Sequence, residues 1–216
     1  MIQGSPEWYS ARLGKVTASR VCDVVAKTKT GFGASRANYM AELIAERLTG
    51  VPAEIYTNGA MAWGVEKEAE ARDAYAFRMD VDVEPVGFIE HPTIAMSGAS
   101  PDGLVGDDGL VEIKCPNTAT HLDTLLRQDV PGKYLPQMHW QMLCAGRRWC
   151  DFVSYDPRLP EPMRLFVKRV PWSDLPGMAL EEFVRDFLAE LDDKIAKLTG
   201  TYDVRLTAQL QASAAA

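Results

Sequence analysis

The chain of 216 residues has few cysteines and no long apolar run, and each shortage excludes a class of protein. Its four cysteines are widely spaced, with no C-x-x-C pair, so we expect neither a disulfide framework nor an iron–sulfur cluster. No apolar stretch approaches the roughly 18 residues that a membrane-spanning helix needs. The N-terminus lacks the basic-then-apolar pattern of a secretory signal. These absences predict a cytoplasmic protein with no membrane partner.

Positive charge is also scarce. The net charge is −7, from 23 basic and 30 acidic residues, which is unfavourable for general attraction to nucleic-acid phosphates. Residues 1–36 reverse this balance, because six basic residues there accompany only two acidic ones. The six are Arg12, Lys15, Arg20, Lys27, Lys29 and Arg36. This segment is either a phosphate-binding arm on an acidic body or a chance cluster of charges.

Length and composition favour one domain. With 47% hydrophobic and 25% charged residues, the chain resembles an ordinary globular protein that is large enough for a sizeable core. We expect residues 1–206 to form a single domain. Residues 207–216 carry no packing signal and are expected to form a flexible tail.

Hydrophobic periodicity and turn residues predict a mixture of helices and strands. Helices are expected to begin at Ser5-Pro6 and at Thr17–Ser19, and to cover residues 38–49 with Asn38 as N-cap, 65–79, 117–128 and 133–146. A last helix is expected over residues 172–198, starting near Ser173-Asp174 and interrupted by Pro176-Gly177. Strands are expected over residues 83–90, 94–99, 104–105, 110–114, 149–156 and 163–170. Residues 28–37 are expected to form a glycine-rich loop, and His121 to lie at the surface.

Residues 99–116 read as two short strands around a tight turn. The turn is Gly106–Gly109, because Gly and Asp tolerate the positive φ that a hairpin needs. Side chains alternate along the second strand, so Glu112 and Lys114 lie on the same face. Asp102 ends the first strand, across the hairpin from this pair. Two carboxylates and one ammonium therefore converge on a small volume.

This convergence has two interpretations. Burying charges costs several kcal/mol unless they are paired, and hard cations such as Mg²⁺ prefer carboxylate oxygens and accept two of them. The first interpretation is therefore a metal site. The second is a surface hairpin with an ordinary Glu–Lys pair.

Six motifs occur in order along the chain and favour the first interpretation. They are Trp8-x-x-x-Arg12-x-Gly14-x-x-Thr17-Ala18-Ser19, Ala62-Trp63-Gly64-x-x-x-Glu68, Ser100-Pro101-Asp102-Gly103-Leu104, Glu112-Ile113-Lys114-Cys115-Pro116, Gln137-x-x-x-Gln141 and Tyr155-Asp156-Pro157-Arg158. The hairpin resembles the PD-(D/E)XK nuclease superfamily. The six motifs together, over about residues 5–200, resemble the phage lambda exonuclease family, also called YqaJ-type viral recombinases.

The resemblance implies an α/β (α+β) fold with a restriction-endonuclease-like core, in which helices flank a central mixed β-sheet. It implies a Mg²⁺-dependent, processive 5′→3′ exonuclease that hydrolyses the 5′-ended strand of duplex DNA to mononucleotides. The product would be a 3′ overhang for single-strand-annealing recombination. The resemblance further implies a ring-shaped homotrimer, a single-strand annealing protein as partner, and the host cytoplasm of a phage or prophage as location.

The family's metal-site roles transfer to matching positions of this chain. The resemblance implies that Asp102, Glu112 and the backbone carbonyl of Ile113 bind one or two Mg²⁺ ions, for which Mn²⁺ substitutes, and that Glu68 completes the site. Lys114 would position the attacking water and help to deprotonate it. A lysine beside cations should have a lowered pKa, which predicts an alkaline optimum.

The family's DNA contacts transfer in the same way. The resemblance implies that Arg12, Ser19 and Ser100 hold the 5′-terminal phosphate and that Gln137 orients water or the scissile phosphate. The chain departs from the family at Thr120, where the family has an arginine in the 5′-phosphate pocket. Either another basic residue replaces that arginine, or the phosphate is held less firmly.

Three further alternatives remain at this stage. Met61 matches the position of an apolar wedge that separates the last base pairs, or it packs in the core. A structure-specific or restriction-type PD-(D/E)XK endonuclease would share the same catalytic residues. A non-catalytic DNA-end or partner-binding module would share only the fold, and intact Asp102, Glu112 and Lys114 argue against it.

Overall fold

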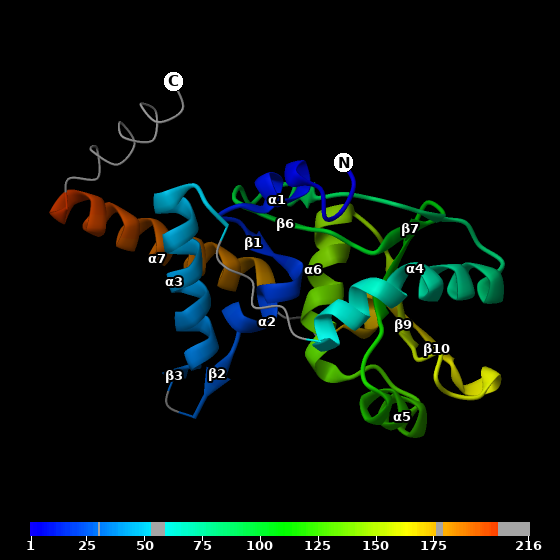
Figure 1. The fold of residues 1–216 in the computed structure, drawn as a ribbon. Helices are drawn as coiled ribbons and strands as arrows, with labels where there is room; N and C mark the ends of the chain where they lie inside the picture. The colour runs from blue at the N-terminus through cyan, green and yellow to red at the C-terminus, as the bar shows by residue number, and fades with distance from the viewer. Residues whose placement is uncertain (30, 53–58, 176–178, 203–216) are drawn as a thin grey trace.

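The computed structural model describes residues 1–29, 31–52, 59–175 and 179–202, apart from the side chains of residues 60 and 61 (Figure 1). The predicted tail and the predicted domain end at residue 206 lie outside this part of the chain. Among the described helices, none combines the length and the apolar character needed to cross a membrane.

A five-stranded mixed sheet organises one half of the fold, with strand order β10-β9-β8-β7-β4. Neighbouring strands are antiparallel except β8 and β9, which are parallel. The strands are β4 Val83–Glu84, β7 Gly103–Val105, β8 Gly109–Lys114, β9 Trp149–Tyr155 and β10 Leu165–Pro171. Helices cover this mixed sheet, so the predicted fold class is confirmed.

Two smaller sheets complete the strands. One has the order β1-β6-β5, formed by Val16–Thr17, Ser97–Ala99 and Ile89–Glu90. The predicted strands over 83–90 and 94–99 are therefore each shorter, and the first is divided between two sheets. The other is a hairpin of β2, Lys27–Thr28, and β3, Gly31–Phe32.

The helices are α1 Pro6–Arg12, α2 Val21–Val24, α3 Ala34–Thr49, α4 Gly59–Met79, α5 Thr118–Arg127, α6 Leu135–Ala145 and α7 Leu180–Thr201. Ser5 and Asn117 cap α1 and α5, with their side-chain oxygens accepting from the amides of Trp8 and Thr120. Gly50 and Gly146 end α3 and α6 in the left-handed conformation, as predicted.

Several predicted boundaries are wrong, including that of α4, which begins at Gly59 and not at residue 65. Asn38 is not an N-cap, because α3 begins four residues earlier and the buried Arg36 in its first turns pairs with Glu190 of α7. Residues 28–37 are therefore not one loop, since the β2–β3 hairpin and the start of α3 occupy most of them. A short 3-10 turn over Trp172–Asp174 precedes α7, which starts only at Leu180.

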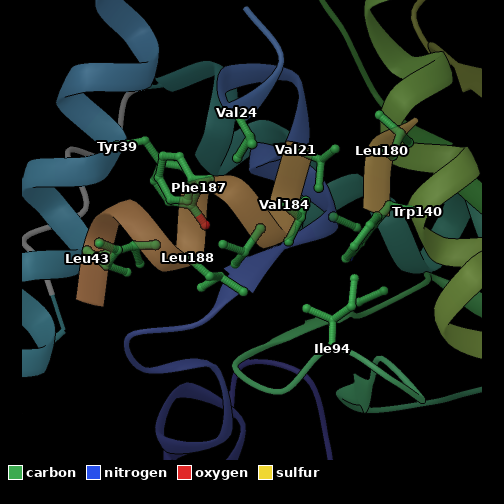
Figure 2. Close-up of a cluster of buried hydrophobic side chains, with 14 of the residues drawn as sticks. Val21, Val24, Tyr39, Leu43, Ile94, Trp140, Leu180, Val184, Phe187 and Leu188 are labelled. Carbon is green, nitrogen blue, oxygen red and sulfur yellow. The ribbon is translucent and has the colours of Figure 1, made fainter. Parts of the chain in front are cut away.

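The largest core cluster joins α2, α3, α6 and α7. Figure 2 shows Val21 and Val24 of α2, Tyr39 of α3 and Phe187 of α7 gathered with Trp140 of α6. The rings of Tyr39 and Phe187 stack with centroids 5.7 Å apart. Removing these large apolar side chains from water is what holds the four helices together.

Helix α6 separates this cluster from the main sheet, because it also buries Met138 and Met142 against the face of β8 that carries Leu110. On the opposite face of β8, Val111 and Ile113 pack with side chains of α4. The predicted alternation along this strand is confirmed. It directs the side chain of Glu112 toward α6.

His121 does not lie at the surface. Its ring is fully buried and hydrogen-bonds Ser154 Oγ at 2.7 Å and the backbone oxygen of Met163 at 2.8 Å. The prediction was wrong because helical periodicity does not reveal that the start of α5 packs against β9. The ring's two hydrogen bonds explain how a polar side chain is accommodated there.

Candidate active site

The hairpin of β7 and β8 brings Asp102 beside Glu112. Gly103 pairs with Val111 in the antiparallel register, so the preceding Asp102 lies level with Glu112. Asp102 Oδ2 accepts a hydrogen bond of 2.6 Å from the amide of Ile113. A Cβ on Gly103 would lie 2.2 Å from Cγ1 of Val83, so only glycine allows β4 to pack this closely behind Asp102.

Glu112 is the centre of a dense set of polar contacts. Only 1% of the residue is exposed. Lys114 Nζ lies 2.5 Å from its Oε1, and Gln137 Nε2 donates to the same oxygen at 2.6 Å. Gln141 Nε2 donates to Oε2 at 2.5 Å. β8 supplies the two charged groups and α6 supplies the two amides, one helical turn apart.

The pKa values of Asp102 and Lys114 are both raised. Burial and the nearby Glu112 raise the pKa of Asp102 well above its usual range, although Lys114 and the Ile113 amide act in the opposite direction. Burial alone would lower the pKa of Lys114, but Glu112 and Asp102 outweigh this effect and raise it. The expected lowered pKa of Lys114 assumed bound cations, and the two carboxylates by themselves have the opposite effect.

Glu68 lies nearby on α4, close enough for its charge to raise the pKa of Asp102 further. It accepts a hydrogen bond from Arg72, one turn along the same helix. Within the described residues, no three Asp, Glu, His or Cys side chains gather in an arrangement that would hold a metal by themselves. The structure thus brings Asp102 and Glu112 together and leaves Glu68 beside them, in an ion pair.

The donor set at this hairpin nevertheless suits a divalent cation. Two carboxylates and the backbone carbonyl of Ile113 offer the oxygen atoms that Mg²⁺ and Mn²⁺ prefer. The raised pKa of Asp102 means that its charged form lacks sufficient compensation in the chain alone, and a bound cation would provide it. The four cysteines are free thiols, three of them buried.

The residues predicted to hold a 5′-phosphate form a second group. Arg12 Nη1 and Trp8 Nε1 both donate to Ser100 Oγ, at 3.2 and 2.9 Å. Arg12 and Ser19 line one cavity of about 960 Å³ between α1, α3 and α4. Ser19 is exposed and its Oγ lies 3.4 Å from that of Thr17. Gln137, by contrast, belongs to the Glu112 group.

Arg12 differs from three of the other basic side chains in the N-terminal segment. Lys15 pairs with Glu90, Arg20 with Asp23 and Glu42, and Arg36 with Glu190. In the described part of the chain, Arg12 forms no such ion pair, and its guanidinium stacks on the Trp8 ring at 4.1 Å. Burial lowers its pKa. Three of the six basic residues of the expected arm are thus paired with carboxylates, while Arg12 contacts Trp8 and Ser100 and feels the charge of Glu46 without an ion pair.

Two other predicted positions are less informative. The wedge interpretation of Met61 lies outside the described residues, because only its backbone, in α4, is described. Thr120 is half-buried in the first turn of α5, where its amide donates to the capping Asn117 at 2.9 Å. The structure thus accounts for Thr120 as part of a helix start.

Sequence reasoning gave no role to several residues that the fold brings to this region. Gln141 was noted only for its spacing from Gln137, and its burial against Glu112 could not be inferred from that spacing. The fully buried Asp156 accepts hydrogen bonds from Thr118 and Arg158, and Arg158 also donates to the Pro116 carbonyl at 3.3 Å. This network fixes the segment that follows Lys114.

Comparisons with known proteins bear on the family and the fold of this chain. The family model described as YqaJ-like viral recombinase domain matches residues 7–148. The crystal structure of LHK-Exo in complex with dAMP is 52% identical and has a TM-score of 0.84, with 95% of this chain and 100% of that chain covered. The crystal structure of an alkaline exonuclease (LHK-Exo) from Laribacter hongkongensis is 51% identical, with the same TM-score and coverage.

A more distant structure, the phage related exonuclease from Haemophilus somnus 129PT, shares 14% identity and a TM-score of 0.66 over 87% of this chain and 96% of that one. At that identity it supports the fold alone. A comparison with curated protein sequences finds no match. The family model covers well over half of the chain, and the predicted family is confirmed: the chain belongs to the YqaJ-like viral recombinase domain family.

Proposed function

We propose that this chain is a divalent-cation-dependent exodeoxyribonuclease that hydrolyses phosphodiester bonds from the ends of double-stranded DNA. One observation carries the proposal. Asp102, Glu112 and Lys114 meet at the end of one hairpin, in a chain 52% identical to a protein named an exonuclease. Paired carboxylates beside a lysine suit hydrolysis of a phosphodiester, because the reaction needs an activated water and relief of negative charge.

The residues of this chain would have the following roles in hydrolysis. Asp102, Glu112 and the carbonyl of Ile113 would hold one or two Mg²⁺ or Mn²⁺ ions, with Glu68 reaching them directly or through water. A bound cation of this kind lowers the pKa of water and neutralises charge on the scissile phosphate. Lys114, whose side chain is 28% exposed, would hold the attacking water and move its proton. Gln137 would orient that water or the phosphate.

We propose that Arg12, Ser19 and Ser100 bind the 5′-terminal phosphate. The support is the position of Arg12, a partly buried cation that lines the large cavity and contacts Ser100. An arginine offers a planar pair of donors that matches a phosphate. Anchoring this end would give 5′→3′ polarity, mononucleotide products and a 3′ overhang.

Further proposals follow from family membership. A single domain over residues 1–206 would assemble as a homotrimeric ring around duplex DNA, which would make digestion processive. The overhang would be passed to a single-strand annealing protein in phage-type recombination. The wedge role of Met61 belongs to the same proposal.

A linear duplex labelled separately at its 5′ and 3′ ends tests the proposal. We expect release of the 5′ label as a mononucleotide with Mg²⁺ and no release without it. Lys114→Ala and Asp102→Ala should abolish cleavage while DNA binding persists. As a control, Lys197→Ala, at an exposed position of α7, should leave the cleavage rate unchanged. Cleavage of closed circular DNA would favour an endonuclease instead. Wild-type cleavage rates in both active-site variants would contradict the proposed mechanism.

A further inference from the structure

Glu112 has two carboxylate oxygens in different surroundings. Oε1 faces Lys114 and Gln137, whose side chains are both partly exposed. Oε2 faces the interior, where it accepts from Nε2 of Gln141 at 2.5 Å, and Gln141 is 0% exposed. One oxygen thus borders the open side of the site and the other is enclosed.

The orientation of the Gln141 amide follows from its partner. If the amide were rotated by 180°, its carbonyl oxygen would face a carboxylate oxygen, and two acceptors would meet without a proton between them. The NH₂ group must therefore face Glu112. In this orientation Oε1 of Gln141 is buried, and no donor in the described residues reaches it.

The unpaired Oε1 of Gln141 indicates the role of this side chain. A buried acceptor without a donor destabilises the fold, so an amide is a poor choice for filling space. Met138 and Met142, buried on the same helix, fill space without such a cost. The amide of Gln141 is therefore explained by the carboxylate that it holds and not by packing.

We propose that Gln141 is a positioning residue that fixes Oε2 of Glu112 against the interior, so that Oε1 is presented to the divalent cation. This rests on the proposed function. Lys114 and Gln137 both contact Oε1, and from their partly exposed positions they can exchange that oxygen for water or phosphate. Gln141 has no access to solvent and retains its hold on Oε2. Without it, the carboxylate group would turn about its last torsion angle, which is soft.

The proposal predicts which properties change. Partners of metal ligands outside the coordination sphere typically contribute 10- to 100-fold to metal affinity. The loss of Gln141 should therefore weaken the binding of cations. It should not weaken the binding of DNA, because a side chain with 0% exposure cannot touch a substrate.

The test uses the full chain and two variants, Gln141→Met and Gln141→Asn. The first removes the amide at similar volume, and the second keeps an amide that is one methylene too short to reach Oε2. Mn²⁺ binding is measured by calorimetry without DNA, and duplex binding without metal. We expect the Mn²⁺ dissociation constant to rise roughly tenfold or more in both variants, and the DNA dissociation constant to stay within about twofold. Excess Mn²⁺ should restore part of the lost kcat.

Met138→Leu is the matched control, since it changes a buried side chain of α6 that packs in the apolar cluster with Leu110 and Phe152 and has no amide. Wild-type Mn²⁺ affinity in both folded variants would overturn the positioning role and leave the proposed function intact. Loss of the folded state in both variants, with the control folded, would also overturn it, because Gln141 would then serve the core. Failure of the wild-type chain to bind Mn²⁺ would instead overturn the proposed function, and the positioning role with it.

Discussion

Arg12 donates from Nη1 to Oγ of Ser100 at 3.2 Å, which ties helix α1 to the segment that leads into the candidate metal site. Ser100 lies only two residues before Asp102. The proposed phosphate pocket and the proposed cation site are therefore joined through one short stretch of backbone. A phosphate held at Arg12 would stay in a fixed position relative to the carboxylates.

Arg12→Ala should remove most of the preference for a 5′-phosphorylated end. A hydrogen bond to a charged group is worth about 1.5–3 kcal/mol, so we expect kcat/KM on 5′-phosphorylated duplex to fall about 10- to 100-fold. The rate on a 5′-hydroxyl duplex should change little. Arg12→Lys should be intermediate, because a lysine keeps the charge but not the paired donors.

The control for this prediction is Arg127→Ala, which removes an exposed arginine of α5 that pairs with Asp123. It should leave both rates unchanged. If Arg12→Ala lowers the rates on phosphorylated and hydroxyl ends equally while the protein stays folded, Arg12 has no specific role with the 5′-phosphate.

The parts of this site that the sequence predicted are those set by local rules. Alternation along β8 and the turn at residues 106–109 are properties of adjacent residues, and they were sufficient to place Glu112 with Lys114 and across from Asp102. The caps at Ser5 and Asn117 are equally local. The family resemblance added roles for these residues but no contacts.

The parts that escaped prediction depend on partners far apart in the chain. The basic N-terminal segment looked free because Glu90 and Glu190, which pair with Lys15 and Arg36, are distant in sequence. His121 looked exposed because nothing in α5 indicates that β9 covers it. Gln141 escaped for the same reason, since its partner Glu112 lies 29 residues away.

Asp156 should contribute strongly to stability. It is fully buried, and Oδ2 accepts from Thr118 Oγ1 at 2.7 Å while Oδ1 accepts from Arg158 Nε at 2.7 Å. Removing one partner from a buried charged pair typically costs 3–5 kcal/mol, and because Arg158 is half-exposed we expect Asp156→Ala to cost about 3 kcal/mol. Urea unfolding at pH 7 measures this, with Asp193→Asn on the exposed side of α7 as control.

The same carboxylate gives a pH dependence with a definite sign. Burial alone would raise the pKa of Asp156, but hydrogen bonds from Arg158 and Thr118 outweigh it and lower the pKa below its usual range. The folded-state pKa thus lies below the unfolded one. This stabilisation is present above about pH 4 and is lost as the pH falls through the folded value. Between pH 7 and pH 3 the wild type should lose more stability than Asp156→Asn, and equal losses would contradict the assignment.

Gly109 should not tolerate a side chain. It pairs with Trp149 across β8 and β9, and a Cβ there would lie 2.1 Å from the indole ring. Arg169 stacks on that indole at 3.5 Å, so moving the ring would also disturb this contact. We expect Gly109→Ala to cost about 2 kcal/mol in unfolding free energy, a typical value for overpacking.

Two further variants distinguish this clash from a general intolerance of alanine. Gly132→Ala should be nearly neutral, because no atom lies within 4 Å of the added methyl group. Combining Gly109→Ala with Trp149→Leu should cost less than the sum of the two single changes, because the smaller side chain leaves room for the methyl. Strict additivity would show that the indole is not the obstacle.

Mn²⁺ should stabilise the fold through the carboxylate pair. A ligand that binds only the folded state at 100 times its dissociation constant contributes about 2.7 kcal/mol, which corresponds to several degrees in Tm for a domain of this size. Thermal unfolding should show this shift in the wild type and in Glu182→Gln, an exposed change on α7, and EDTA should reverse it.

Asp102→Asn should lose the Mn²⁺-dependent shift in Tm. Without metal, however, this variant should be at least as stable as the wild type at pH 8, because the burial and the neighbouring Glu112 that raise the pKa of Asp102 also penalise its charged form. A wild-type Mn²⁺ shift in Asp102→Asn would place the cation elsewhere.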